Sequence, residues 1–570
     1  MKQRTAVATL SFVIAVLVLV NIIAFYVYGR FDLTREKRYT LTPATRELLG
    51  NLDDIAYVKV YLEGEFPAGF KRLRNSTQEM LDEMRSYSGG MLEYEFSDPM
   101  ANSDAKEREA VTQQLMDKGL SPTRLIENTE EYSEKIIFPG AVVSYKGRDL
   151  PVILLQEQLN KSPDETLNNS IALLEYNLAN AVQKLQRPTK PSIAFLEGHG
   201  ELPPKAVEDF AFTLSKYYLL KRFNLKDNLY IPSREFSAVV IAKPTQKFEE
   251  SDKYKLDQYI MNGGRVLWLV ENLNTELDSL QRNGGAFIAT DYGLNLEDQL
   301  FRYGARVNFD VVQDMQCSQI PLAVGIDQFG NAQDMQLFPW SYFPVATNHN
   351  NEHPVSKNMD ALLFQFAATI DTITGKNAAK VEKTILISSS KYSRRTNAPI
   401  KINVNDVRQK PDPAQYPDRN LPLAVALEGE FESAFKNRLA FSTQAMVDTL
   451  PELKFKDHSQ ATRMVVIADG DFCRNDIDPK TGRSTPLGYY KYTRETFANK
   501  DFLLNAIEWL TDENGIIAAR SRELKMRLLD EQRVKDEKFF WQLLNTLCPI
   551  ALVLGFAGLF GWLRRRKYAQ

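Results

Sequence analysis

The sequence is poor in cysteine and histidine. Its 570 residues include three cysteines and four histidines. Cys548 lies within an apolar segment, so Cys317 and Cys473 could form at most one disulfide. A disulfide framework is therefore excluded, and a structural zinc site is not expected. His349 and His353 have helical spacing, but residues 348–354 resemble a turn and lack the glutamate of a zinc protease motif, which predicts a surface loop.

The motifs of nucleotide hydrolysis and covalent catalysis are also absent. The nearest approach to a phosphate-binding loop, residues 64–69, is followed by Phe70 where that loop requires lysine. No Gly-x-Ser-x-Gly or Gly-x-Cys-x-Gly elbow follows a predicted strand. The net charge of -3 gives no electrostatic case for nucleic acid binding. These absences predict a protein that is not an enzyme and has no cofactor, metal or nucleic acid partner.

Acidic and basic residues are missing from two segments of 25 residues, 5–29 and 539–563. About 20 apolar residues in a helix span a bilayer core, so both segments are predicted transmembrane helices. The first could instead be a cleaved signal peptide, but its apolar run is long and no small-residue cleavage site follows. The second could be a buried C-terminal helix, but it ends in Trp562 and four cations, residues 564–567, which favours a membrane interface.

The same cations set the predicted topology. Basic residues concentrate on the cytoplasmic side of membranes, so we place both termini in the cytoplasm. Residues 30–538 would then be periplasmic, in the inner membrane of a Gram-negative bacterium. Basic residues 30, 35, 37 and 38 oppose this orientation locally, although long domains can be translocated despite such charge.

Residues 30–187 are expected to form an N-terminal α/β domain. Residues 55–62 and 92–96 read as strands on either side of a helix over 71–87, with further strands over 136–138, 141–145 and 150–155. A helix is expected over 168–185. This order suits a thioredoxin-like domain, and the absence of Cys-x-x-Cys makes it a scaffold rather than a redox centre.

Residues 188–514 are expected to form a second, Rossmann-like domain. Apolar strands are predicted over 192–196, 236–242, 265–270 and 463–469, with helices up to about 218 and over 248–261. Alternating strands and helices indicate a doubly wound parallel sheet. Residues 310–460 are less regular, residues 401–420 read as an exposed loop, and the aromatic cluster 337–344 could either stack on a ligand or pack internally.

Between this domain and the second apolar segment, residues 515–538 are predicted to form a juxtamembrane stalk helix. Residues 520–538 are dense in charges of both signs and contain neither Gly nor Pro. Such a helix would couple the outer domain to the membrane, or it would be a solvated linker with no further role.

Two loops that follow predicted strands carry the candidate ligand residues. These residues are Glu197, His199, Glu201, Asp469 and Asp471. Ligands of α/β folds bind at the carboxyl ends of strands, so the five side chains form a candidate ligand cleft. A histidine between carboxylates could also serve acid–base chemistry, whereas Asp-Gly-Asp more often makes a turn.

Five sequence blocks resemble a known family. They are residues 61–73, 195–201, 256–268, 467–472 and 498–507. Together they resemble GldG, the gliding-motility-associated auxiliary components of Bacteroidetes ABC transporters, over nearly the whole length. The resemblance implies a permease partner, a separate cytoplasmic ATPase, a link to gliding motility and a glutamine-amidotransferase-like sheet. Because the nucleophile elbow is missing, it does not imply amidotransferase catalysis.

The leading hypothesis is a non-enzymatic, membrane-anchored extracytoplasmic subunit of an ABC transporter complex. Its partners would be the permease, the ATPase and membrane lipid, and a homodimer within the complex stays open. The alternatives are a tethered glycan- or peptide-binding module that acts without transport, and a hydrolase that uses His199.

Overall fold

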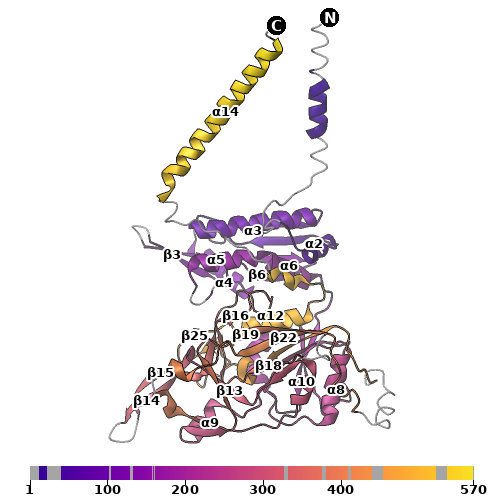
Figure 1. Cartoon of the computed structure of the whole chain (residues 1–570), viewed down its shortest axis with the longest axis vertical. Coiled ribbons are helices and arrows are strands. Elements are labelled where there is room, and N and C mark those ends of the chain that lie inside the picture. Colours follow the sequence, from indigo (N-terminus) through magenta and orange to yellow (C-terminus); the bar gives the residue numbers. More distant parts are fainter. Residues whose placement is uncertain are drawn as a thin grey trace. The chain divides into compact units, whose positions relative to one another are not determined.

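The computed structural model describes most of the chain, which separates into two units, Met1–Arg522 and Glu523–Gln570. The described residues are 10, 12–21, 40–101, 104–128, 132–156, 158, 161–326, 332–374, 380–408, 412–438, 454–521 and 536–568. Within the first unit we distinguish an N-terminal lobe, residues 40–187, from a sheet lobe, residues 188–521 (Figure 1).

A four-stranded mixed sheet forms the centre of the N-terminal lobe. Its order is β2-β1-β5-β6, with β1 parallel to β2 and antiparallel to β5. The strands are β1 Ala56–Val60, β2 Leu92–Phe96, β5 Gly140–Tyr145 and β6 Arg148–Ile153. Helix α3, Ala68–Tyr87, connects β1 to β2. The predicted strand–helix–strand unit is therefore confirmed, and Leu73, Leu81 and Met84 are among the buried residues of α3.

The helix expected over 168–185 is two helices. Helix α5, Pro163–Ala172, starts five residues earlier than predicted, because Ser162 and Glu165 form a capping box at its first turn. Helix α6, Leu174–Gln186, follows after a break at Leu173. The expected strand over 136–138 is also different: β4 ends at Ile137 and pairs with β3 in a separate hairpin. The remaining elements of this lobe are α2 Pro43–Gly50, α4 Ala105–Asp117, β3 Thr123–Asn128 and β4 Tyr132–Ile137.

The sheet lobe is built on an eight-stranded mixed sheet with the order β16-β19-β22-β23-β10-β9-β7-β8. Five strands, from β23 to β8, are parallel, and three are antiparallel. The parallel strands are β7 Ser192–Glu197, β8 Leu219–Asn224, β9 Phe236–Ala242, β10 Val266–Leu269 and β23 Thr462–Ile467. The antiparallel strands are β16 Asn348–His349, β19 Val381–Ser388 and β22 Pro422–Gly429. The predicted parallel sheet is thus present, but an antiparallel edge from the irregular region extends it.

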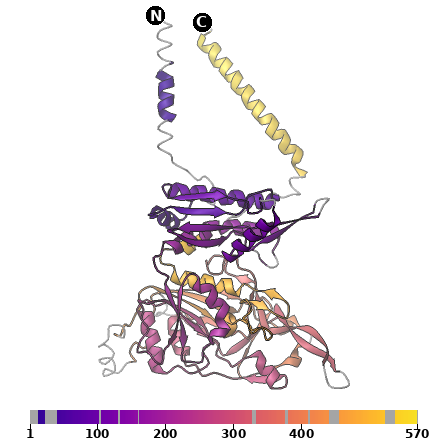
Figure 2. The ribbon, with the colours of Figure 1, turned by 180° about the vertical axis from the view of Figure 1, so that it is seen from behind.

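Helices cover both faces of this sheet. Alternate strand residues such as Val239 and Trp268 pack in one buried cluster with α8, Glu250–Met261, and α10, Glu297–Tyr303. Helix α12, Asn499–Thr511, contacts β9, β10 and β23 and lies beside the N-terminal lobe in both views (Figure 1 and Figure 2). Burying an apolar side chain such as Val239 contributes about 1.5–3 kcal/mol, so the packing of these layers stabilises the sheet.

Other strands of this lobe form small sheets, and a second apolar cluster lies among them. Trp340, Tyr342 and Phe343 are buried in it, so the aromatic segment packs internally. Within the expected loop 401–420, residues 401–408 belong to a strand and a 3-10 helix. The other elements of the sheet lobe are α7 Glu208–Ser215, α9 Leu277–Arg282, β11 Ala286–Ala289, β12 Ala305–Val307, β13 Asp310–Asp314, β14 Cys317–Ile326, β15 Ala332–Ala346, β17 Leu362–Leu363, β18 Ile370–Thr372, β20 Ser393–Asn397, β21 Ile400–Asn403, β24 Tyr489–Tyr490, β25 Glu495–Thr496, and the 3-10 helices η1 Pro204–Val207, η3 Val404–Arg408, η4 Pro413–Gln415, η5 Gly470–Cys473 and η6 Ile516–Ser521.

The part of the second unit that the structure describes contains the helix α14, Lys538–Tyr568. Its stretch Lys538–Arg566 is long and apolar enough to cross a membrane. Of the first predicted span, the described residues show a shorter apolar helix, Phe12–Asn21, so two spans are not demonstrated. The predicted stalk begins as the packed 3-10 helix η6, not an α-helix, and residues 522–535 lie outside the described residues.

Candidate functional site

The strand order places a candidate site at one edge of the large sheet. Along the parallel strands, β8-β7-β9-β10-β23, the order of the connections reverses between β7 and β9. In doubly wound sheets, ligands bind outside the carboxyl ends of the strands at such a reversal. Charged residues follow four of the strands directly or closely: Glu197 ends β7, Lys243 follows β9, Glu271 follows β10 and Asp469 follows β23.

His199 lies near this reversal but inside the protein. Its ring is fully buried and stacks on Phe248, with 3.7 Å between the ring centroids. The Nε2 atom lies 3.1 Å from the Asp252 carboxylate, and the Nδ1 atom lies 3.6 Å from that of Glu201. The main-chain nitrogen of His199 donates to Glu201 at 2.7 Å. A substrate therefore has no access to this ring, and the contacts hold the loop after β7 in place.

The glycines around His199 explain why the sequence looks like a ligand loop. Gly200 has a φ of +74°, and a Cβ at this position would lie 2.3 Å from the Thr245 hydroxyl oxygen. The main-chain oxygen of His199 accepts hydrogen bonds from Thr245 and Gln246, each 2.9 Å long. The glycine is needed for this close packing between the loops after β7 and β9.

The two predicted aspartates belong to a different, buried charge cluster. The Lys243 Nζ atom lies 3.0 Å from the Glu271 carboxylate and 2.5 Å from that of Asp471. Burial lowers the pKa of Lys243, but the two carboxylates outweigh it and raise the pKa above its usual value. Burial raises the pKa of Glu271 to about 7, against the opposing effect of Lys243. The cluster is thus a structural ion network at the ends of three strands.

Asp469 serves as a cap for the helix η5. Its carboxylate accepts a hydrogen bond from the main-chain nitrogen of Asp471 at 2.8 Å and another from that of Gln365 at 2.7 Å. Asp471 in turn accepts from Arg474 at 3.2 Å. Burial raises the pKa of Asp469 well above its ordinary value, and the Asp471 charge adds to that rise.

A cavity of about 320 Å³ opens beside these two aspartates. The wall also includes Arg474, Asn499 and the tyrosines at 489, 490 and 492. Glu197, His199 and Glu201 do not line it, so the five candidate residues do not form one cleft among the residues described. The sequence reasoning missed Lys243 and Glu271, although their positions just after buried parallel strands were a usable signal.

The remaining histidine and cysteine candidates lie elsewhere. His349 is part of the edge strand β16, and the ring of His353 packs against Trp509 at 5.1 Å, so both are more enclosed than the surface loop expected for them. Cys317 and Cys473 are free thiols. No cluster of three or more potential metal ligands occurs in the part of the chain that the structure describes.

These features define a membrane-associated α/β protein whose strand-end charges support its own structure. A family model described as an ABC-type uncharacterized transport system matches residues 190–506, more than half of the chain. The protein therefore belongs to this family of transport-system components. Family membership suggests an auxiliary, non-catalytic role in a transporter assembly. Residues 35–144 match a domain family of unknown function.

Relatives add little functional detail. A Borreliella burgdorferi protein, described as uncharacterized, is 22% identical over 569 residues, covering 98% of this chain and 97% of the relative. Among solved structures, the mmIFT52 N-terminal domain is 14% identical to this chain, with a TM-score of 0.30. The match covers 59% of this chain and 100% of that domain. That score is too low to support a structural argument.

Proposed function

We propose that this protein is a non-enzymatic, membrane-anchored subunit of an ABC transporter complex that pairs with a permease and a separate ATPase. The observation that carries this proposal is the family match over residues 190–506. Since the sequence contains no phosphate-binding loop, another subunit would supply ATP hydrolysis. The sequence blocks that resemble the GldG family further support a link to gliding motility in Bacteroidetes.

The proposed topology puts the large lobes in the periplasm and both termini in the cytoplasm. Helix α14 supports the membrane anchor, and Arg564–Arg566 at its end support a cytoplasmic C-terminus. The N-terminal segment 5–29 would be the second span. For the finer fold, the order β2-β1-β5-β6 supports a thioredoxin-like N-terminal domain, and the parallel half of the large sheet supports an amidotransferase-like one.

Purification of the intact, tagged chain from its own membrane tests the proposal. Mild detergent extraction followed by mass spectrometry should recover a permease and an ATPase with the tagged chain. A tagged, unrelated protein anchored by one apolar helix provides the background. Recovery of neither subunit above that background would contradict the proposal.

A second candidate function is ligand binding without transport, and the 320 Å³ cavity favours it. Its wall combines Asp469 and Asp471 with tyrosines, and such surfaces can bind the hydroxyl groups of a glycan or a peptide. Glycan or peptide arrays with the full chain test this function. Binding that persists in an Asp471→Asn, Tyr489→Ala variant would exclude this cavity as the site.

A further inference from the structure

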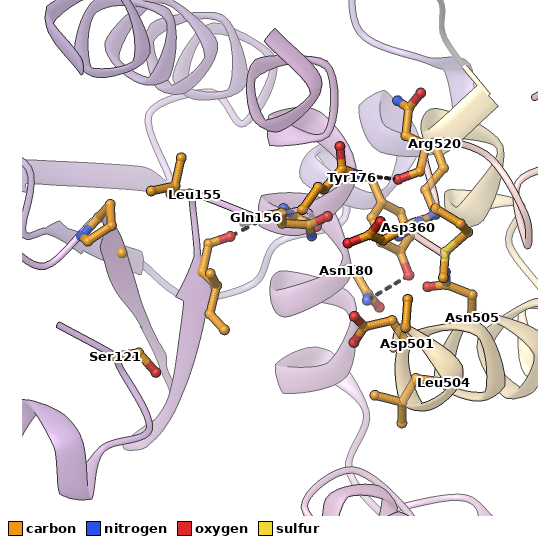
Figure 3. A pocket seen from close by; sticks show the side chains of 18 of the residues that line it. Ser121, Leu155, Gln156, Tyr176, Asn180, Asp360, Asp501, Leu504, Asn505 and Arg520 are labelled. Carbon is orange, nitrogen blue, oxygen red and sulfur yellow. Dashed lines mark hydrogen bonds between the residues drawn. The ribbon is translucent and has the colours of Figure 1, made fainter. Parts of the chain in front are cut away.

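A second cavity, of about 470 Å³, lies between the two lobes. In Figure 3, Ser121 and Leu155 lie on one side, and Asp501, Asn505 and Arg520 lie on the other. Its volume is within the range of small-molecule sites, roughly 300–1,000 Å³, and such sites favour domain boundaries. It is separate from the strand-end cavity and shares none of the candidate residues of the sequence.

One wall of the cavity is held by its own hydrogen bonds. Tyr176, Asn180 and Lys184 are four residues apart on α6, so they share one face of the helix. All three contact the carboxylate of Glu508 on α12, with 3.1 Å between the Asn180 amide nitrogen and an oxygen of Glu508. This wall is therefore preorganised, and its polar groups are already satisfied.

Arg520 supplies unused hydrogen-bond donors. Its guanidinium carbon lies 5.0 Å from the centre of the Tyr176 ring, and Nε donates to the main-chain oxygen of Pro354 at 3.0 Å. The residue is only 5% exposed, and the Glu508 and Asp501 carboxylates act on its charge. Among the described residues, its two terminal nitrogens make no hydrogen bond. Because those nitrogens form a planar fork, they match a carboxylate group.

Asp501 and Asn505 supply unused acceptors on the facing helix α12. The Asp501 carboxylate makes no hydrogen bond within the described ranges. Burial raises its pKa, the charges of Lys500 and Arg520 oppose that rise, and the charge of Asp360, which also lines the cavity, adds to it. The Asn505 amide nitrogen donates to the main-chain oxygen of Val355 at 3.2 Å, which leaves its side-chain oxygen without a described partner. Asp501 and Arg520 can thus bind groups of opposite charge on one small ligand, and the Asn505 oxygen can accept a further hydrogen bond from it.

We propose that this cavity binds a small zwitterion, either a free amino acid or a short peptide. Arg520 binds the ligand's carboxylate, and Asp501 binds its ammonium group with help from the Asn505 oxygen. A sugar is disfavoured, because both nearby aromatic faces are covered: Arg520 lies over Tyr176, and Lys184 lies 3.9 Å from the centre of the Tyr217 ring. This assignment does not depend on the role in a transporter.

Binding of alanine, dialanine and trialanine to the detergent-solubilised full chain tests the proposal. We expect saturable binding of at least one of them to the wild-type protein. N-terminal acetylation or C-terminal amidation of the bound peptide should each weaken binding at least tenfold. Asp501→Asn should weaken it similarly and leave the unfolding temperature nearly unchanged, since Asp501 has no hydrogen bond to lose in the described structure.

Asp227→Asn is the matched control, because Asp227 is exposed outside the cavity and should leave binding unchanged. Three results would overturn the proposal: no saturable binding of any of the three probes, equal affinity for acetylated or amidated peptide, or Asp501→Asn with wild-type affinity. The blocked peptides test it on the wild-type protein even if the variant does not fold.

Discussion

Glu508 is the residue that joins α12 to the N-terminal lobe. Its carboxylate contacts Tyr176, Asn180 and Lys184, whose side chain is only 11% exposed. Burial lowers the pKa of Lys184 and raises the pKa of Glu508, and the charge of Arg520 opposes the rise at Glu508. Removing one member of a buried ion pair leaves an uncompensated charge.

Glu508→Gln should therefore destabilise the protein strongly. We expect the free energy of unfolding to fall by about 3–5 kcal/mol, measured by denaturant unfolding of the full chain in detergent. Glu430→Gln is the control, because Glu430 pairs with Lys380 at 2.6 Å on the surface, where water screens the pair, and its loss should change the free energy of unfolding little. Equal effects of the two substitutions would show that Glu508 does not hold the lobes together.

His349 and His353 should make stability depend on pH. Burial lowers the pKa of each to about 4, from the ordinary 6.5. Between pH 6.5 and 4 the unfolded chain binds protons that the folded protein does not, so the free energy of unfolding falls as the pH is lowered. The pKa values of Glu271 and Glu508 are raised, so these two groups make the free energy of unfolding rise as the pH is lowered. The contribution of the histidines is therefore obtained by comparing the wild type with a variant that lacks them.

The unfolding midpoint at pH 7 and at pH 5 provides the measurement. The variant His349→Asn, His353→Asn should lose less stability between these values than the wild type does. His458→Asn, at an exposed position paired with Asp457, should leave the difference unchanged. A double variant with the full wild-type pH response would rule out these two imidazoles as its source.

Among the secondary-structure elements, buried parallel strands were the best predicted. β7, β9 and β10 were found within about two residues, because each is a short, nearly continuous apolar run. β19, which lies between β16 and β22, was missed because Glu382 and Lys383 interrupt its apolar pattern. Antiparallel strands that join a sheet from a distant part of the chain leave little periodic signal in the sequence.

The site was predicted less well than the sheet, for a related reason. The Gly-His-Gly loop resembles a ligand loop, but packing on Phe248 makes His199 structural. The cavity between the lobes could not be predicted, since Tyr176 and Glu508 are 332 residues apart. Such a contact depends on the packing of the two lobes and not on any local pattern.

Helix α14 is the element expected to touch a partner. Its apolar side chains are exposed in the described structure, as in Phe556 at 71% and Leu552 at 70%. Replacing residues 539–563 with an unrelated apolar helix of the same length should keep the chain in the membrane but reduce permease recovery severalfold. Quantitative mass spectrometry of the captured material measures this, and undiminished recovery would place the contact elsewhere.

For the whole molecule, the proposed topology predicts opposite protease sensitivity at the two ends of α14. Proteinase K added to spheroplasts should degrade the large lobes, while a tag fused after Gln570 stays protected until the membrane is permeabilised. The positive charges of Arg564–Arg566 are the physical basis of this orientation. A tag that is cleaved in intact spheroplasts would reverse the assignment.

We propose that this chain works as an auxiliary subunit and not alone. Native mass spectrometry of the mildly extracted assembly tests it most directly, since the chain has a mass of 65.1 kDa. We predict a larger assembly that releases both a permease and an ATPase on activation. Masses equal only to one chain, or to whole multiples of it, would contradict the account.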